Sequence, residues 1–249
     1  MTANPDAVRQ DVERYYSERA REESGPCCDS ESSGGTCCNS YPVELLEGVP
    51  ADAAGMSLGC ADPVSAAGLQ AGETVLDLGS GGGLDCFLAA REVGPQGRVI
   101  GVDMTDAMLE RAEANRARAG AANVEFRKGL IEALPVADAG VDVVISNCVI
   151  NLAPDKAPVL REIARVLKPG GRLAVADIVT RGPILSELRK LVDSWAACVA
   201  GALTVEAYIR GLTEAGFEDV RARPADGRDE EQIAEGLPFS ALITARKPV

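Results

Sequence analysis

The stretch VLDLGSGGGLD, residues 75–85, places a glycine-rich turn between an apolar strand and the start of a helix. Gly79, Gly81 and Gly83 recur at every second position, and only glycine lets such a turn tighten while its backbone approaches a ligand. The next apolar run, residues 98–103, ends at Asp103, where a carboxylate can accept hydrogen bonds from ribose hydroxyls. Together these features predict a ligand that contains a nucleoside.

The carboxylates around the turn help to distinguish two nucleoside-containing ligands, a dinucleotide and S-adenosylmethionine. A dinucleotide places its pyrophosphate on the helix N-terminus, and Asp77 and Asp85, which flank the turn, would repel that group. The same carboxylates suit an ammonium group, and S-adenosylmethionine (SAM) carries both an ammonium and a sulfonium. We therefore expect SAM, with Asp77, Gly79, Gly81 and Asp103 as cofactor-binding residues.

Outward from the turn, strand patterns alternate with helical ones. Alternation of this kind predicts right-handed βαβ units and an α/β fold with a mostly parallel, doubly wound, Rossmann-like sheet. The last two strands are joined without a strong helix, which favours an antiparallel hairpin at one edge. The seven expected strands are 74–79, 98–103, 123–129, 141–147, 171–179, 217–223 and 239–247, and the expected helices are 6–23, 84–93, 105–120, 157–167 and a longer helical region at 185–215.

The same patterns divide the chain into three segments. Residues 1–70 hold an N-terminal helix, a cysteine-rich loop and a segment that covers the cofactor and substrate. Residues 71–180 form the SAM-binding core, and residues 181–249 supply substrate-covering helices and the last two strands. A loop as long as the Ser/Gly/Cys stretch is uncommon inside a compact domain and tends to be functional or disordered.

Composition excludes several functions. The net charge of −13, from 25 Lys and Arg against 38 Asp and Glu, argues against a nucleic-acid partner, which requires clustered cations. No apolar run approaches the ~20 residues of a membrane span, and the N-terminus lacks a signal-peptide pattern, so we expect a cytoplasmic protein without membrane association. The absence of histidine removes an imidazole general base and imidazole metal ligands.

Eight cysteines are poor candidates for a disulfide framework in a reducing compartment. Cys148 immediately follows the fourth strand, at the carboxyl edge where ligands of open α/β folds bind. Cys198 lies in the helical region that follows the fifth strand, and Cys60 precedes the first strand. A free cysteine is usually a small buried apolar residue, and we expect that role for Cys86, in the helix expected at residues 84–93.

Four motifs resemble class I SAM-dependent methyltransferases over about residues 70–180. They are DLGSGGGLD, GVDMTDAML, KGLIEALP and VLKPGGRLAVADI. The resemblance implies that Asp103 holds the ribose, that Met104 lies against the adenine, and that Ile131 and Glu132 flank the adenine ring. Core packing is the other interpretation of Met104.

Three further motifs, MSLGCADP, SNCVINL and WAACVAG, extend the resemblance to arsenite methyltransferases over most of residues 8–222. That resemblance implies arsenic detoxification with arsenite or methylarsenite as the substrate. It also implies that Cys60, Cys148 and Cys198 form a trithiolate site, with the last two binding arsenic most directly. A thiol reductant, thioredoxin or glutathione, is implied as a partner.

The chemistry of arsenic agrees with this assignment. Trivalent arsenic is soft and prefers thiolate ligands to carboxylates. Held by three sulfurs, it keeps a lone pair that can attack the sulfonium methyl directly. No proton leaves the nucleophile, so no general base is needed, and the missing histidine fits the scheme.

The N-terminal doublets Cys27, Cys28, Cys37 and Cys38 are interpreted as auxiliary redox thiols on the Ser/Gly-rich stretch. A structural zinc site is disfavoured because zinc sites use pairs spaced C-x₂₋₄-C, and we expect no resident metal. A pure redox switch is disfavoured because every charge between residues 22 and 41 is negative, whereas reactive thiolates need nearby cations. The alternative function is a SAM-dependent methyltransferase acting on a small organic molecule such as a quinone.

Overall fold

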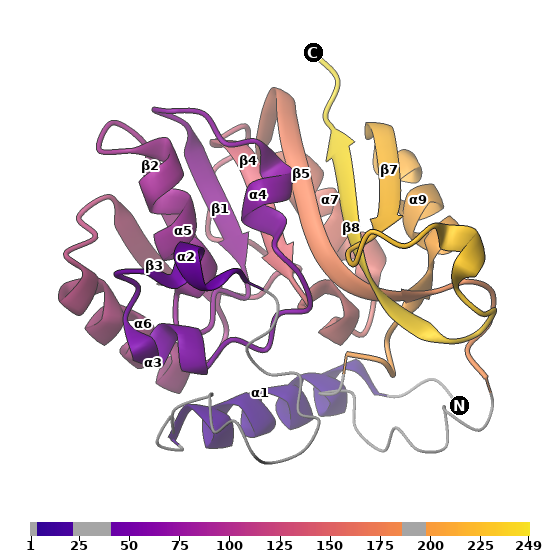
Figure 1. Cartoon of the computed structure of the whole chain (residues 1–249), viewed down its shortest axis with the longest axis horizontal. Helices are drawn as coiled ribbons and strands as arrows, with labels where there is room; N and C mark the ends of the chain where they lie inside the picture. The colour runs from indigo at the N-terminus through magenta and orange to yellow at the C-terminus, as the bar shows by residue number, and fades with distance from the viewer. Residues whose placement is uncertain (1–3, 22–40, 186–197) are drawn as a thin grey trace.

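The computed structural model describes residues 4–21, 41–185 and 198–249, and these form a single sheet flanked by helices (Figure 1). The strands lie in the order β3-β2-β1-β4-β5-β8-β7, and every pairing from β3 to β5 is parallel. The predicted α/β, mostly parallel, doubly wound fold is confirmed. The parallel strands are β1 (Thr74–Leu78), β2 (Arg98–Asp103), β3 (Val124–Lys128), β4 (Val141–Asn147) and β5 (Leu167–Thr180).

The end of the chain supplies the antiparallel edge. β8 (Pro238–Arg246) is inserted between β5 and β7 (Glu218–Pro224) and runs antiparallel to both. The expected antiparallel edge hairpin is therefore confirmed. An eighth strand, the short β6 (Leu203–Thr204), was not expected and pairs with β5.

The predicted helical region 185–215 is only partly correct. Its described C-terminal part contains the helix α9 (Val205–Glu214), which begins where Thr204 Oγ1 accepts a hydrogen bond from the Ala207 amide at 3.1 Å. Residues 198–204 form a bend, a turn and β6 instead of a helix. Cys198 itself has φ of 55°, a left-handed conformation that an α-helix cannot contain. The intervening residues 186–197 lie outside the described residues.

The other helices form close to their expected positions. Asp155 caps α7 (Lys156–Val166) through its side chain, and Gly120, with φ of 63°, ends α6 (Asp106–Ala119) in the left-handed conformation typical of helix C-termini. The expected helix 6–23 is described as far as residue 21. The described helices are α1 (Pro5–Arg21), α2 (Val43–Leu46), α3 (Ala51–Gly55), α4 (Pro63–Ala67), α5 (Leu84–Val93), α6 (Asp106–Ala119) and α7 (Lys156–Val166), with 3₁₀ turns η1 (Ile150–Leu152) and η3 (Glu230–Gln232).

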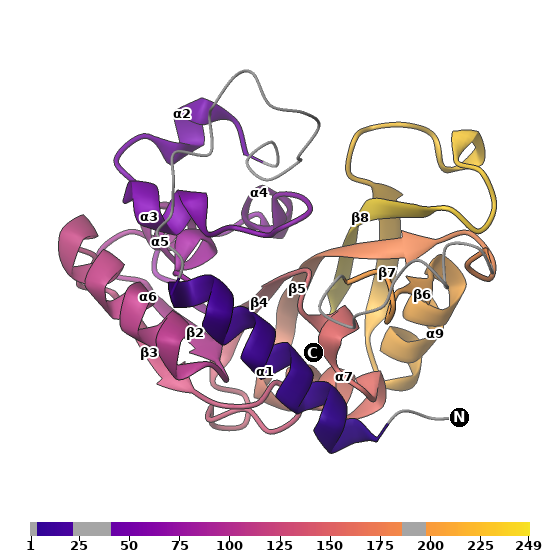
Figure 2. The same ribbon diagram turned by 90° about the horizontal axis from the view of Figure 1, so that it is seen from below.

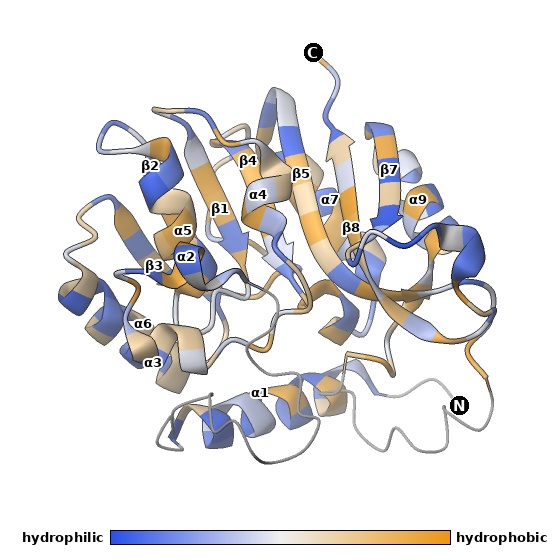
Figure 3. Cartoon of the chain, viewed as in Figure 1, coloured by the Kyte–Doolittle hydropathy of each residue, from blue (hydrophilic) through white to orange (hydrophobic). Residues whose placement is uncertain are grey.

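Two apolar cores, one on each face of the sheet, hold the strands in place. Side chains alternate along a strand, so Val75 of β1 packs with residues of α4 and α5, whereas Leu76 and Leu78 pack with residues of α7 and α9. The apolar colouring of the central strands in Figure 3 reflects this burial on both faces. A sheet covered on both sides leaves its carboxyl edge as the place for a ligand.

Helix α1 crosses that edge. The strands β1 and β4 point toward it in Figure 1, and the view from below in Figure 2 shows it running across the end of the sheet. Its Val8 and Val12 are buried in a small cluster with Leu152. None of the described helices is long and apolar enough to cross a membrane.

Candidate functional site

The glycine turn after β1 needs its glycines for space and for backbone conformation. Gly79 has φ of 67°, and a Cβ there would lie 2.4 Å from the Val149 side chain. Its amide donates to the Val102 carbonyl at 2.8 Å, which ties the turn to β2. Gly81, with φ of 49°, has open space where a Cβ would stand. The turn therefore exposes bare backbone at the carboxyl edge.

Asp103, at the end of β2, fixes this turn from the neighbouring strand. One carboxylate oxygen accepts the Gly81 amide at 3.0 Å, and the other accepts the Thr105 amide at 2.9 Å. Burial raises the pKa of Asp103, and these backbone hydrogen bonds oppose the rise. The carboxylate is thus held rigidly where the ribose of a nucleoside is expected.

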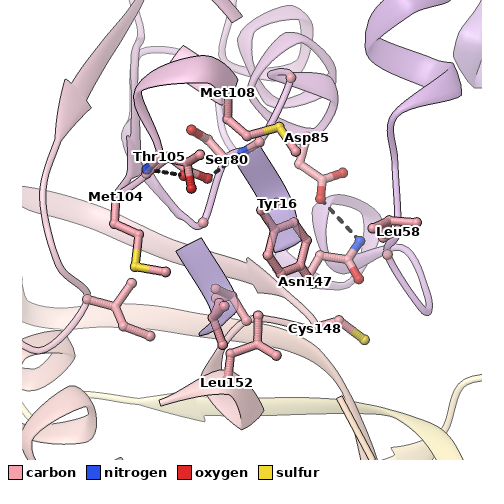
Figure 4. A pocket seen from close by; sticks show the side chains of 18 of the residues that line it. Tyr16, Leu58, Ser80, Asp85, Met104, Thr105, Met108, Asn147, Cys148 and Leu152 are labelled. Atoms are coloured by element: carbon pink, nitrogen blue, oxygen red, sulfur yellow. Dashed lines mark hydrogen bonds between the residues drawn. The ribbon is translucent and has the colours of Figure 1, made fainter. Parts of the chain in front are cut away.

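A pocket opens between this turn, the ends of β2 and β4, and helix α1 (Figure 4). Its walls include six of the seven predicted cofactor residues: Gly79, Gly81, Asp103, Met104, Ile131 and Glu132. The cover comes from α1, whose Arg9 Nε donates to Glu132 Oε1 at 3.1 Å and whose Tyr16 also lines the pocket. Sequence reasoning did not assign α1 to the cofactor site.

The seventh predicted cofactor residue, Asp77, lies below the turn and is not among the residues that line the pocket. It is 2% exposed and accepts a hydrogen bond from the Cys86 thiol at 3.2 Å. Burial raises its pKa, and the nearby Asp85 raises it further. Cys86 is fully buried, as expected. A cofactor role for Asp77 stays a prediction.

Asp85, in the first turn of α5, does face the pocket. It accepts hydrogen bonds from the Tyr41 hydroxyl and from Asn147 Nδ2, the latter at 3.1 Å. Burial raises its pKa from 3.8 to about 6, although both hydrogen bonds act in the opposite direction. The pocket wall also contains Ser80, whose buried hydroxyl has no hydrogen-bond partner among the described residues.

These groups fit SAM. Rigid Asp103 suits ribose hydroxyls, the Asp85 carboxyl suits an ammonium group, and the unpaired Ser80 hydroxyl is a polar atom that a ligand can satisfy. Met104 and Ile131 supply apolar surface for a purine ring. The pocket therefore contains the residue types that each part of this cofactor requires.

The three predicted substrate cysteines come together beside the pocket. Cys148, which follows β4 with φ of 58°, is 6% exposed, and its amide donates to the Ala176 carbonyl at 2.8 Å. Interactions with the Cys198 and Cys60 side chains, together with burial, raise the pKa of the Cys148 thiol far above its ordinary value. Cys198 Sγ also donates to the Cys148 carbonyl at 3.2 Å. Three separate parts of the chain thus deliver their sulfurs to one place.

Of the three, Cys148 also lines the cofactor pocket. In the described part of the chain, no three His, Cys, Asp or Glu side chains surround a single metal-ion position. The three thiols would therefore have to rearrange before they could bind one arsenic atom together. The auxiliary candidates Cys27, Cys28, Cys37 and Cys38 lie outside the described residues.

Sequence reasoning missed Tyr41 and Asn147 in this site. Asn147 Nδ2 lies 2.9 Å from the Tyr41 hydroxyl and 2.9 Å from the Ala61 carbonyl, and its Oδ1 accepts the Cys60 amide at 2.9 Å. A usable signal did exist for Asn147, because it is the polar residue that ends an apolar strand. Nothing in the sequence around Tyr41 indicated its contact with Asp85, which is 44 positions away.

The family comparison agrees with this geometry. Residues 69–222 match a family described as "Methyltransferase domain". The chain is 48% identical over 234 residues to an arsenite methyltransferase of Halobacterium salinarum, and the match covers 91% of this chain and 59% of that protein. It is 39% identical over 225 residues to an arsenite methyltransferase of Aquipseudomonas alcaligenes, covering 86% and 63% of the two chains. The chain thus spans about three fifths of the length of these curated relatives.

Solved structures give the same result. The crystal structure of CrArsM, an arsenic (III) S-adenosylmethionine methyltransferase from Chlamydomonas reinhardtii, matches with a TM-score of 0.63 and 33% identity. That match covers 99% of this chain and 75% of the other. A shorter match, 43% identical over 46% of this chain, is to a demethylmenaquinone methyltransferase of Lactococcus lactis.

Proposed function

Because the chain belongs to the arsenite methyltransferase family of methyltransferase-domain proteins, we propose that it methylates trivalent arsenic with SAM. Arsenite and methylarsenite are the proposed substrates, and detoxification of arsenic is the proposed role. The observation that carries the proposal is that three cysteines meet at the end of β4: the Cys198 thiol donates to the Cys148 carbonyl, and the Cys60 amide donates to Asn147, the residue before Cys148, at the wall of the pocket.

The proposed substrate site works by replacing thiol protons. As(OH)₃ exchanges its three hydroxyls for three sulfurs, and each thiol proton leaves with a hydroxyl as water. The raised pKa of Cys148 keeps this thiol protonated before arsenic arrives. The exchange needs no external base, because each departing hydroxyl takes up a proton.

Cofactor binding is proposed to fall to the turn and to Asp103, with Asp85 near the ammonium group. When bound, SAM would supply a methyl group for transfer to the arsenic lone pair, leaving S-adenosylhomocysteine. The chain then contributes alignment and exclusion of water, both of which lower the barrier by positioning the reactants. Helix α1 supports the second task, since Tyr16 and Val12 close one wall of the pocket.

Methylation removes two electrons from arsenic, so a second round requires a reductant. We propose that two thiols supply these electrons and form a disulfide, which thioredoxin or glutathione reopens by thiol exchange. The doublets Cys27/Cys28 and Cys37/Cys38 are the proposed source of these thiols. This step concerns turnover and is separate from the first methyl transfer.

The proposal is tested by incubating the chain with SAM, arsenite and glutathione, with detection of methylated arsenic by mass spectrometry. The wild-type chain is expected to form product above a heat-killed control. The double substitution of Cys148→Ser and Cys198→Ser is expected to abolish product while SAM binding is retained, because the harder hydroxyls do not replace thiolates on arsenic. Full activity of the double variant, or no product from the wild type, would contradict the assignment.

The same assay separates the alternative of a quinone methyltransferase, which the partial match to the Lactococcus lactis enzyme favours. A demethylated quinone is supplied in place of arsenite, with the same detection of the methylated product. Methylation of the quinone that survives the double cysteine substitution would support that alternative over arsenic.

A further inference from the structure

The segment that carries Cys60 has no regular secondary structure. It lies between α3, which ends at Gly55, and α4, which begins at Pro63, and residues 57–62 belong to neither a helix nor a strand. Cys60 therefore has no helix or strand ladder to hold its thiol beside Cys148. Side-chain hydrogen bonds must take over that task, because backbone groups in partly buried loops need partners.

One side chain, that of Asn147, binds the backbone on both sides of the Cys60 side chain. Asn147 Oδ1 accepts the Cys60 amide at 2.9 Å, and Nδ2 donates to the Ala61 carbonyl at 2.9 Å. An amide side chain used in this way replaces the pair of hydrogen bonds that a neighbouring strand would provide. Asn147 thus connects the Cys60 segment to the end of β4.

The orientation of this amide is itself fixed. Nδ2 lies 3.1 Å from Asp85 Oδ2 and 2.9 Å from the Tyr41 hydroxyl. Because a carboxylate only accepts when ionised, Asp85 keeps Nδ2 on its side and leaves Oδ1 facing the Cys60 amide. Figure 4 shows Asn147 directed toward Asp85, with Cys148 next to it along the chain.

Close packing adds to the hydrogen bonds. A Cβ at Gly59 would lie 2.3 Å from Asn147 Nδ2 and 2.8 Å from Oδ1. The backbone of the Cys60 segment therefore rests directly against the amide, and a larger residue at position 59 would push the two apart. Gly59 and Asn147 therefore form one packed unit that also binds the Cys60 amide.

The geometry points to Asn147 as a positioning residue that supplies the substrate site with its third thiol, by holding Cys60 beside Cys148. This inference rests on the proposed function. Cys198 reaches Cys148 by another route, through its own hydrogen bond to the Cys148 carbonyl. Loss of Asn147 should therefore leave the Cys148–Cys198 pair in place and remove Cys60 from reach.

This division predicts a difference between two arsenic compounds. Arsenite can take three sulfurs, whereas phenylarsine oxide has one valence occupied by carbon and takes two. The variant Asn147→Ala is expected to weaken arsenite binding by about 10- to 100-fold, the range typical of losing a group that orients a metal ligand. Phenylarsine oxide binding is expected to be unchanged.

Both affinities are measured by titration calorimetry without SAM, so that contacts of Asn147 with the cofactor do not contribute. The 249-residue chain is used with Cys27, Cys28, Cys37 and Cys38 replaced by Ser, so that these thiols cannot supply the third sulfur. Arsenic X-ray absorption then counts the sulfurs directly. Three are expected before the Asn147→Ala substitution and two after it.

Two further variants make the test specific. Gly59→Ala keeps the amide but displaces the segment, and it is expected to reproduce the selective loss of arsenite binding. Asn123→Ala removes an amide that also holds two backbone carbonyls, those of Ala90 and Gly94, at the opposite edge of the sheet. It is expected to leave the ratio of the two affinities unchanged.

The possible failures are distinguishable. If the chain with Asn147 intact binds neither compound, the proposed function is wrong and this inference with it. If Asn147→Ala weakens both compounds in parallel, or leaves arsenite bound by three sulfurs, only the positioning role is wrong. Retained phenylarsine oxide binding shows that the variant has folded.

Discussion

We expect SAM binding to depend most directly on Asp103, because this residue binds the glycine turn and faces the pocket. Replacement by Asn should disrupt one of its two backbone hydrogen bonds and remove the charge. Hydrogen bonds to charged groups contribute about 1.5–3 kcal/mol, so the dissociation constant of SAM is expected to rise by roughly 10- to 100-fold. Titration calorimetry measures this change.

The matched control is Asp106→Asn, three positions further on. Asp106 is exposed and pairs with Lys128 at 2.6 Å on the surface, where ion pairs contribute little. Its substitution should leave SAM affinity unchanged. An Asp103→Asn chain that binds SAM as tightly as the wild type would remove Asp103 from the cofactor site.

Because Asp85 lines the pocket with a raised pKa, we expect it to make SAM binding depend on pH. Its pKa is raised by burial from 3.8 to about 6. Between those values the folded chain holds a proton that the unfolded chain has lost, so this group lowers stability as pH rises through the window. A cationic ligand prefers the ionised carboxylate and must displace the proton. SAM affinity is therefore expected to fall as pH drops below about 6, with proton release on binding.

Calorimetry near pH 6 in two buffers of different ionisation enthalpy detects the released proton. Asp85→Asn should abolish the release. Asp177→Asn is the control, because burial also raises the pKa of Asp177, to about 7, but this residue does not line the pocket. Proton release that persists in the Asp85→Asn variant would assign the effect to another group.

At the residue scale, the sequence predicted the parts of the site that lie within one motif. The turn glycines and Asp103 sit at fixed spacings around one strand and one turn, so a short pattern is enough to identify them. The Tyr41–Asp85–Asn147 network joins residues 44, 62 and 106 positions apart. No local pattern encodes such contacts, because they depend on how distant loops pack.

Among the elements, helix α1 has the most testable role. Val12 is 3% exposed and packs with Leu152 over the pocket. Fully burying a Val contributes about 1.5–3 kcal/mol, and an unpaired buried carboxylate costs more than that. Val12→Asp should therefore release α1 and speed SAM dissociation by at least about tenfold, the equivalent of 1.4 kcal/mol. Stopped-flow displacement of SAM measures this rate.

The melting temperature should change little in the same variant, because α1 contributes no residue to either of the two large cores. Arg14→Glu, on the exposed face of α1, is the control and should leave SAM dissociation unchanged. Equal rates for Val12→Asp and the wild type would mean that α1 does not retain the cofactor.

The elements also show where sequence patterns stop being informative. The helical rhythm of residues 6–23 predicted α1 and its apolar side, but an amphipathic pattern identifies a face and not its partner. The region around Cys198 was expected to be helical as part of the stretch 185–215. The left-handed φ of Cys198 and its hydrogen bond to the Cys148 carbonyl override that local preference through tertiary contacts.

For the whole molecule, β8 joins the end of the chain to the parallel core. Ile243 of β8 is fully buried and lies opposite Val175 of β5 and Ala222 of β7. Its replacement by Ala should lower the free energy of unfolding by about 2–5 kcal/mol, and Ile243→Val by about 0.5–1.5 kcal/mol. Urea unfolding monitored by circular dichroism provides both values.

The SAM dissociation constant of Ile243→Ala is expected to equal that of the wild type well below the melting temperature, because Ile243 does not line the pocket. The substitution would then lower stability without changing SAM affinity. The reason is that the two apolar cores stabilise the sheet, whereas the ligand binds at its carboxyl edge. A weakened site in a fully folded Ile243→Ala chain would instead show that packing at β8 is transmitted through β5 to Ala176, whose carbonyl accepts the Cys148 amide.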